Sequence, residues 1–193
     1  MTNRRFAAGC LAVAALCFPA SAFAQQAVPV APCDVTDMTS PPAVDWMREH
    51  GWRYATPEAA HSAYLALVNG QSPWPDWFVP AVSVLQPGTM FQMALSSTQP
   101  DNRPGGFGTF DFIENVAEAR EDLAVLLAWK PDIQRVTIYR VTQPLLVLIG
   151  PIGPQVDPGT CQLLEGRFSQ FQMLVPGDDR MRYLAVVSSR PIQ

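Results

Sequence analysis

The first two dozen residues decide which part of this chain is left to fold. Two arginines precede an uncharged apolar run over residues 6–18, and small residues follow up to Ala24. A basic start, a short apolar segment and small residues before a cleavage point are the features of a secretory signal peptide. The run is too short to span a bilayer as a helix. We therefore expect residues 1–24 to be removed on export, which makes Gln25 the mature N-terminus.

Export places the mature chain in the periplasm or outside the cell, where disulfides form. Two of the four cysteines leave with the leader, so Cys33 and Cys161 remain as an even pair. We predict a disulfide between them, with two unpaired thiols as the alternative. No metal site is expected, because neither His50 nor His61 has a ligand-like spacing to a cysteine.

Charge and length narrow the classes of function. The full sequence has 13 basic and 17 acidic residues, and the leader removes two of the basic ones. Nucleic acid is therefore not expected as a partner. About 170 mature residues suit one domain with a substantial core. The mature sequence contains no second apolar segment long enough to cross a membrane.

The mature chain is predicted to be α+β, with helices in the N-terminal half and compact antiparallel sheets in the C-terminal half. Residues 25–42, rich in Pro, Ala, Thr and Ser, are expected to form an extended arm, followed by one globular domain over residues 43–193. The prolines and aromatic residues of the segment 72–80 predict an irregular stretch that packs over the core.

Start, stop and periodicity signals place the individual elements. Ser40 and the prolines after it predict a short helix, and Thr56 with Pro57 predicts the start of a longer one. Apolar residues at helical spacing predict a third helix over 112–127, capped by Asp111, with Arg120 at the edge of its apolar face. Strands are predicted at 82–85, 89–95, 135–141, 145–149, 168–175 and 182–187.

The common catalytic motifs are missing from the sequence. It has no G-x-S-x-G elbow, no Walker loop and no H-E-x-x-H, and its one lysine, Lys130, follows Trp129 at an expected helix end. Both histidines lie within residues 50–61, which argues against a Ser-His-Asp triad. Acid–base chemistry would have to rest on the carboxylates of residues 111–122, for which a solvated helix face is the alternative.

Residues 136–162 carry a more specific pattern. Tyr139 and Val141 end one strand, and Pro144, Leu145 and Val147 begin the next. The run Gly150-Pro-Ile-Gly-Pro154 comes after them, and Pro158-Gly159 then leads to Gln162. In this order the residues resemble the tuberculosis necrotizing toxin family of NAD glycohydrolases. Shorter matches lie upstream, at residues 87–89, 106–109 and 119–120.

The resemblance implies an ADP-ribosyltransferase-like pair of sheets with NAD in the cleft between them, as a substrate and not as a tightly bound cofactor. Carried onto this chain, it makes Arg120 the cation at the pyrophosphate and Gln162 the amide that orients a water or ribose. Phe91 or Phe107 would stack on nicotinamide. Because nicotinamide is a good leaving group, such positioning and electrostatics suffice for cleavage.

The chain departs from the family at two positions. An arginine is expected within Met90–Met93, where the sequence reads Met-Phe-Gln-Met, and Val136 or Thr137 stands where a histidine is expected. Arg103, in the glycine-rich loop, is a candidate substitute for the missing cation. The plainer interpretation is a buried strand followed by proline-directed turns, with Arg120 in ion pairs on its own helix.

Two functions of different class remain open. The first is an exported NAD-binding enzyme that cleaves the nicotinamide–ribose bond or transfers ADP-ribose. The second is a non-catalytic periplasmic or secreted protein that presents Trp74, Trp77, Phe78 and the loop at residues 105–106 to a protein partner. Convergence of Arg120, Gln162 and an aromatic ring on one pocket would favour the enzyme.

Overall fold

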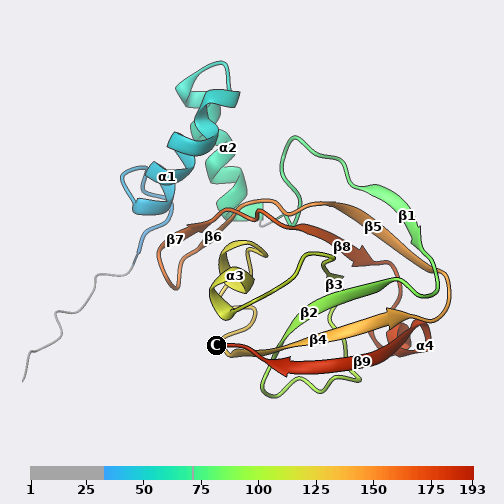
Figure 1. Ribbon diagram of the computed structural model, residues 1–193. Helices are drawn as coiled ribbons and strands as arrows, with labels where there is room; N and C mark the ends of the chain where they lie inside the picture. Colours follow the sequence, from blue (N-terminus) through green and yellow to red (C-terminus); the bar gives the residue numbers. More distant parts are fainter. Residues whose placement is uncertain (1–32, 71) are drawn as a thin grey trace, which may run out of the picture. The chain divides into compact units, whose positions relative to one another are not determined.

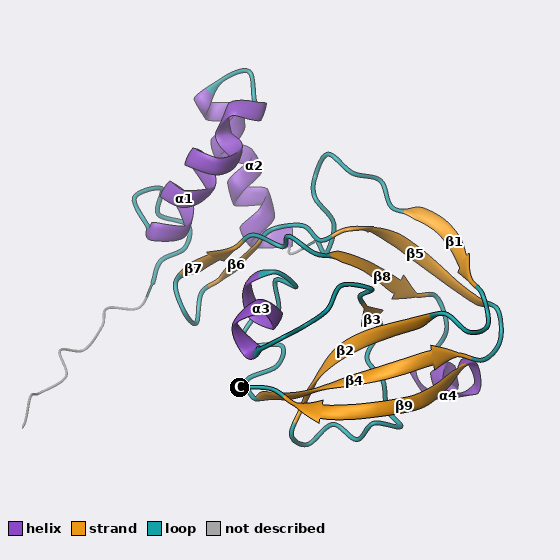
Figure 2. Cartoon of the chain, in the orientation of Figure 1, coloured by secondary structure: helices purple, strands orange, loops and turns teal. Residues whose placement is uncertain are grey.

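The computed structural model describes residues 33–70 and 72–193, which belong to one compact unit. The expected signal peptide and the first part of the expected arm lie outside these residues. The architecture is α+β, as predicted, with two helices first and the sheets after them (Figure 1, Figure 2). In the described part of the chain, no helix is both long and apolar enough to span a membrane.

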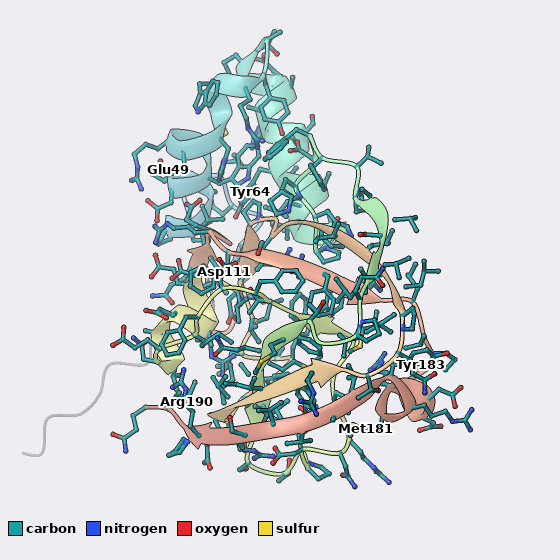
Figure 3. The ribbon with its side chains drawn as sticks, turned by 45° about the vertical axis from the view of Figure 1, so that its right-hand side comes forward. Glu49, Tyr64, Asp111, Met181, Tyr183 and Arg190 are labelled. Carbon is teal, nitrogen blue, oxygen red and sulfur yellow. A yellow bond between two sulfur atoms is a disulfide. The ribbon has the colours of Figure 1, made fainter. Side chains whose placement is uncertain are left out.

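The N-terminal elements form a small helical layer with its own core. They are α1 (Pro41–His50), η1 (Gly51–Arg53) and α2 (Pro57–Gly70). The predicted start of α2 is confirmed, because Thr56 Oγ1 accepts a hydrogen bond from the backbone amide of the third residue after it, at 3.2 Å. Trp46 and Tyr64 are buried between the helices, with ring centroids 5.6 Å apart. Tyr64 is labelled in Figure 3.

The strands form two antiparallel sheets and one hairpin. Sheet A has the order β1 (Ala81–Leu85), β5 (Leu145–Pro151), β8 (Ser169–Met173) and β3 (Phe107–Gly108). Sheet B has the order β2 (Met90–Ser96), β4 (Ile133–Val141) and β9 (Leu184–Pro191). The hairpin pairs β6 (Gln155–Asp157) with β7 (Gln162–Leu164). Gln92 and Thr109 exchange two backbone hydrogen bonds, of 2.8 and 3.0 Å, which connect β2 to the segment after β3.

The six predicted strands match β1, β2, β4, β5, β8 and β9 to within four residues at each end, whereas β3, β6 and β7 were not predicted. The predicted strand 182–187 begins instead at Leu184, because Arg182 lies in the short helix α4 (Arg180–Tyr183). This helix follows η2 (Gly177–Asp179), and together they form the connection from β8 to β9. The same connection brings Arg180 beneath the glycine-rich loop, where its guanidinium donates to Pro104 O at 3.1 Å.

The main core lies between the two sheets. Phe91 of β2 is buried, stacks on Tyr139 of β4 at 5.5 Å between centroids and meets Phe171 of β8 edge-on at 4.9 Å. Gly108 lies against these rings, and a Cβ there would come within 2.6 Å of Phe171 and 2.8 Å of Phe91. Only glycine lets β3 approach so closely. Phe91 is therefore a core residue whose ring packs on other aromatic rings, and its predicted stacking on nicotinamide stays a prediction.

The third helix is much shorter than predicted. α3 runs from Val116 to Glu121 and not over residues 112–127. Its N-cap is Asn115, whose side chain accepts a 2.9 Å hydrogen bond from an amide of the first turn, and not Asp111. Ala124 has a φ of 47°, in the left-handed region, so the chain leaves the helical path there. The apolar residues that suggested a long helix divide between two clusters. Ile113 and Val116 pack with residues of β4, whereas Ala124 packs with Ile152 and Leu164.

Asp111 has a different structural role, because it fixes the loop between β3 and α3 to sheet A (Figure 3). Its carboxylate accepts hydrogen bonds from the Ser169 amide and hydroxyl, each at 2.7 Å, and from Thr109 Oγ1 at 3.1 Å. Burial alone would raise the pKa of Asp111, but the hydrogen bonds outweigh burial and bring the pKa below its usual value.

Two predictions about the connections are confirmed. The segment 72–80 has no regular structure and packs over sheet A, where Phe78 covers Gly150 and Gly153 N donates to Pro73 O at 2.9 Å. Cys33 and Cys161 form a disulfide across a sequence separation of 128. The disulfide joins the segment before α1 to the turn before β7.

Candidate functional site

A cavity of about 400 Å³ lies where the two sheets are connected by the Gln92–Thr109 pair; we call it the inter-sheet cavity. Its walls come from the middle of β2, the glycine-rich loop over residues 105–109, the loop after α3, Gln170 of β8 and Pro73. Its volume falls in the range of small-molecule binding sites. The cavity is therefore large enough for a small-molecule ligand, and it lies beside the core.

Most of the cavity wall is apolar. Its apolar residues include Met93 and Ala94 of β2 and Leu123 and Val125 of the loop after α3, together with two aromatic residues. These are Phe107, 41% exposed, and Trp129, 49% exposed, so both rings reach solvent as well as the cavity. Aromatic rings that are only partly covered favour a flat ligand that can stack on them.

Amide and hydroxyl groups supply fixed polar contacts in this wall. The Gln92 amide donates to Asp111 O at 3.3 Å and accepts from Ile113 N at 3.5 Å. The Gln170 amide donates to Pro73 O. These partners are backbone atoms, so the orientation of both amides is set by the fold. The cavity thus combines an apolar wall with a few oriented polar groups, the usual pattern of a ligand site.

Lys130 is the one charged residue in the described lining of the cavity. Its Nζ donates to Ala94 O at 2.8 Å and to Gln99 Oε1 at 2.9 Å. Burial, together with the nearby charge of Arg135, lowers the pKa of the Lys130 amine below its ordinary value. A cation in this partly desolvated position interacts with an anionic ligand more strongly than a surface lysine does.

Arg120 does not belong to the lining of the cavity. Its guanidinium donates to the backbone oxygens of Val125 at 3.0 Å, Leu126 at 3.1 Å and Lys130. Burial lowers the pKa of Arg120 from its ordinary value, but an arginine remains charged in proteins. In the described structure Arg120 therefore holds the loop that forms one wall of the cavity.

The other predicted residues also lie apart from one another. Gln162 is exposed on β7, next to the disulfide, and Arg103 is exposed in the loop before β3. Of the residues predicted for the NAD site, Phe107 alone lines the cavity in the described part of the chain. Arg120, Gln162 and an aromatic ring do not converge on one cavity. Catalytic roles for Arg120 and Gln162 stay predictions.

Sequence reasoning missed three of the polar side chains in the cavity, namely Gln92, Gln170 and Lys130. Gln92 nevertheless lies within Met90–Met93, the stretch where the family resemblance implies an arginine, so that strand does reach the cavity. Lys130 carried a usable signal, because it is the single lysine of the chain and follows a tryptophan. Nothing in the sequence distinguishes Gln170 from the other glutamines.

The described residues hold no group of three or more His, Cys, Asp or Glu side chains placed to bind a metal ion. The cavity's polar contacts come instead from two glutamine amides, one threonine hydroxyl and one ammonium. Such groups bind and orient an organic ligand by hydrogen bonding and charge.

Comparison with solved structures identifies proteins of similar fold. The chain is similar to a structure described as Tne2 in complex with Tni2, with a TM-score of 0.52 and 21% sequence identity, over 62% of this chain and 97% of the other. Two further similarities are looser. One is Rhs1-CT in complex with its cognate immunity protein RhsI1, at a TM-score of 0.42 and 16% identity, over 59% and 80% of the two chains. The other is Tse6 in complex with Tsi6, at 0.38 and 17%, over 74% and 91%.

At 21% identity the likeness to Tne2 shows a shared fold and nothing more specific. No protein-family model matches the chain, and no curated protein matches it in sequence.

Proposed function

We propose that this chain is an exported protein of toxin-like fold that binds NAD in the inter-sheet cavity. The observation that carries the proposal is the position of the cavity between the two sheets. The resemblance to NAD glycohydrolases implies that NAD lies in such a cleft. Phe107, in the glycine-rich segment, contributes to the lining. The shared fold with Tne2 supports the comparison of these positions. The disulfide supports an oxidising compartment.

The contacts of the cavity suit the nicotinamide end of NAD. A pyridine ring can stack on Phe107 or Trp129, and its carboxamide is a donor and acceptor that matches an oriented glutamine amide such as Gln92 or Gln170. Because both amides are already held by backbone atoms, binding costs them little ordering entropy.

Cleavage of NAD has weaker support than binding. Breaking the nicotinamide–ribose bond requires groups that stabilise charge developing at the reacting centre. In the described structure the Arg120 guanidinium is occupied by three backbone oxygens, and Gln162 lies on the exposed hairpin. We therefore propose binding with slow or absent nicotinamide release. Incubation of the mature protein with NAD, followed by chromatography of nicotinamide, tests this part, and rapid release would contradict it.

Binding itself is tested by calorimetric titration of NAD into the disulfide-bonded protein. Phe107→Ala should weaken binding about fivefold or more, because stacking on an aromatic ring contributes about 1 to 3 kcal/mol. Phe110→Ala is the matched control, since Phe110 is equally exposed, at 41%, and lies three residues after Phe107 but outside the cavity lining. Absence of saturation with millimolar NAD would overturn the proposal, as would equal effects of the two substitutions.

A protein partner is the second candidate function, favoured by an apolar surface on sheet A. Val82, Val84, Leu146 and Leu174 are each at least 42% exposed, and Val84 and Leu146 are register partners on neighbouring strands. The Tne2 structure was solved with Tni2, which makes a protein partner for this fold a specific hypothesis. A protein that copurifies with the wild type and with Phe107→Ala, but not with Val84→Asp, would support it. Of the predicted contact residues, Trp77 is 64% exposed, whereas Phe78 packs on Gly150.

A further inference from the structure

Lys130 has a hydrogen-bonding capacity that the described structure does not use up. An ammonium has three N–H donors, and Nζ has two partners, Ala94 O and Gln99 Oε1. Both partners are neutral. No carboxylate lies within ion-pair distance of Lys130 among the described residues.

The charges near Lys130 in the described structure do not balance its positive charge. Asp132 is the carboxylate whose charge acts on it, at longer range, and the positive charge of Arg135 opposes that effect. Partly buried charges are usually paired, because desolvation is otherwise uncompensated. An unpaired cation in a cavity wall, with one donor remaining, therefore matches an anionic ligand.

We infer that Lys130 is the residue through which the inter-sheet cavity binds a phosphate group of its nucleotide ligand. The inference rests on the proposed function, since it assigns one contact within the same site. It places the ring of the nucleotide on the aromatic and amide side of the cavity and its phosphate at Nζ. The chain thus supplies the phosphate cation from the loop after α3, while Arg120 holds that loop in place.

The test compares two ligands that differ by one phosphate, nicotinamide mononucleotide and nicotinamide riboside, on the wild type and two variants. The wild type should bind the mononucleotide about tenfold or more tightly, because a charge-assisted hydrogen bond is present only with the phosphate. Lys130→Gln, which keeps a donor for Ala94 O without the charge, should lose this preference, and so should Lys130→Met. Arg182→Gln is the control, since its side chain is 76% exposed.

A second measurement does not depend on substitution. Because the chain has one lysine, selective ¹³Cε-lysine labelling gives a single resonance whose titration reports the pKa of Lys130 directly. The mononucleotide should raise this pKa, since an adjacent anion favours the ammonium, whereas the riboside should not. A purely structural lysine would show no such difference.

The outcomes separate the two proposals. Equal affinity of the wild type for both ligands, or an unchanged pKa in the presence of the mononucleotide, would overturn the role of Lys130 and leave NAD binding intact. If neither compound nor NAD binds, the proposed function fails and this inference fails with it. A phosphate preference that persists in folded Lys130→Gln, verified by circular dichroism, would assign the phosphate contact to another residue.

Discussion

Replacing Arg120 distinguishes a structural role, which its observed hydrogen bonds indicate, from the pyrophosphate contact that the sequence resemblance implies. Arg120→Met removes the guanidinium but keeps an apolar stem, so the three hydrogen bonds to Val125, Leu126 and Lys130 are lost with little change in packing. A hydrogen bond to a charged group contributes about 1.5 to 3 kcal/mol. The three bonds share one side chain, and water can reach part of the loop after their loss. We therefore expect a net destabilisation of about 3 kcal/mol.

Urea unfolding followed by circular dichroism measures this value, as a lower midpoint with an unchanged m-value. For a domain of this size the melting temperature should fall by about 6 to 12 °C. Arg182→Met is the matched control, because Arg182 is 76% exposed and pairs with Asp179 at 3.2 Å on the surface. It should change stability by less than about 0.5 kcal/mol. Unchanged stability of Arg120→Met together with lost NAD binding would refute this reasoning and restore Arg120 as a ligand contact.

Three further predictions concern export, the disulfide and acid stability. Mass spectrometry of the exported protein should give Gln25 as the first residue, and retention of the leader would remove the basis for an oxidising compartment. Removing the Cys33–Cys161 bridge should lower the free energy of unfolding by about 2 to 4 kcal/mol. The chain-entropy model gives a larger value, roughly 5 kcal/mol, for a sequence separation of 128. An unchanged urea midpoint would show that the bridge is not formed in solution. The folded-state pKa of Asp111 is lowered, so its carboxylate stabilises the fold above the unfolded pKa of about 4, and this stabilisation is lost as pH falls through the folded pKa. Asp111→Asn should therefore reduce the loss of stability at acid pH. A pH profile of stability identical to that of the wild type would contradict this.

Local signals in the sequence were sufficient for much of the fold. The N-cap at Thr56, the proline after it and the alternation in the strands depend on nearby residues, so the helix and strand positions could be predicted. The third helix could not, because its end depends on tertiary contacts. The Asp111 carboxylate accepts hydrogen bonds from Ser169 of β8 and does not cap the helix. The Arg120 guanidinium binds backbone oxygens of the residues after α3, which are not helical.

The site was harder to predict because its composition depends on how the two sheets pair. Phe91 and Gln92 are neighbours in β2, yet Phe91 packs in the core and Gln92 lines the cavity. Gln92 is brought to the cavity by its pairing with Thr109, a contact between segments far apart in the sequence. Phe107 lies in the cavity lining, and its stacking on nicotinamide stays a prediction. Lys130 and Gln170 join the cavity through long-range contacts that no local pattern encodes.

Hydrogen–deuterium exchange with and without millimolar NAD tests the central claim most directly, because it reports both binding and its location. The account predicts slower exchange in the segments that form the inter-sheet cavity, namely residues 92–94, 105–109 and 123–130. The outer face of sheet A, including β1, should exchange at the same rate with and without NAD. Unchanged exchange throughout the chain, or protection confined to β1, would contradict NAD binding in this cavity.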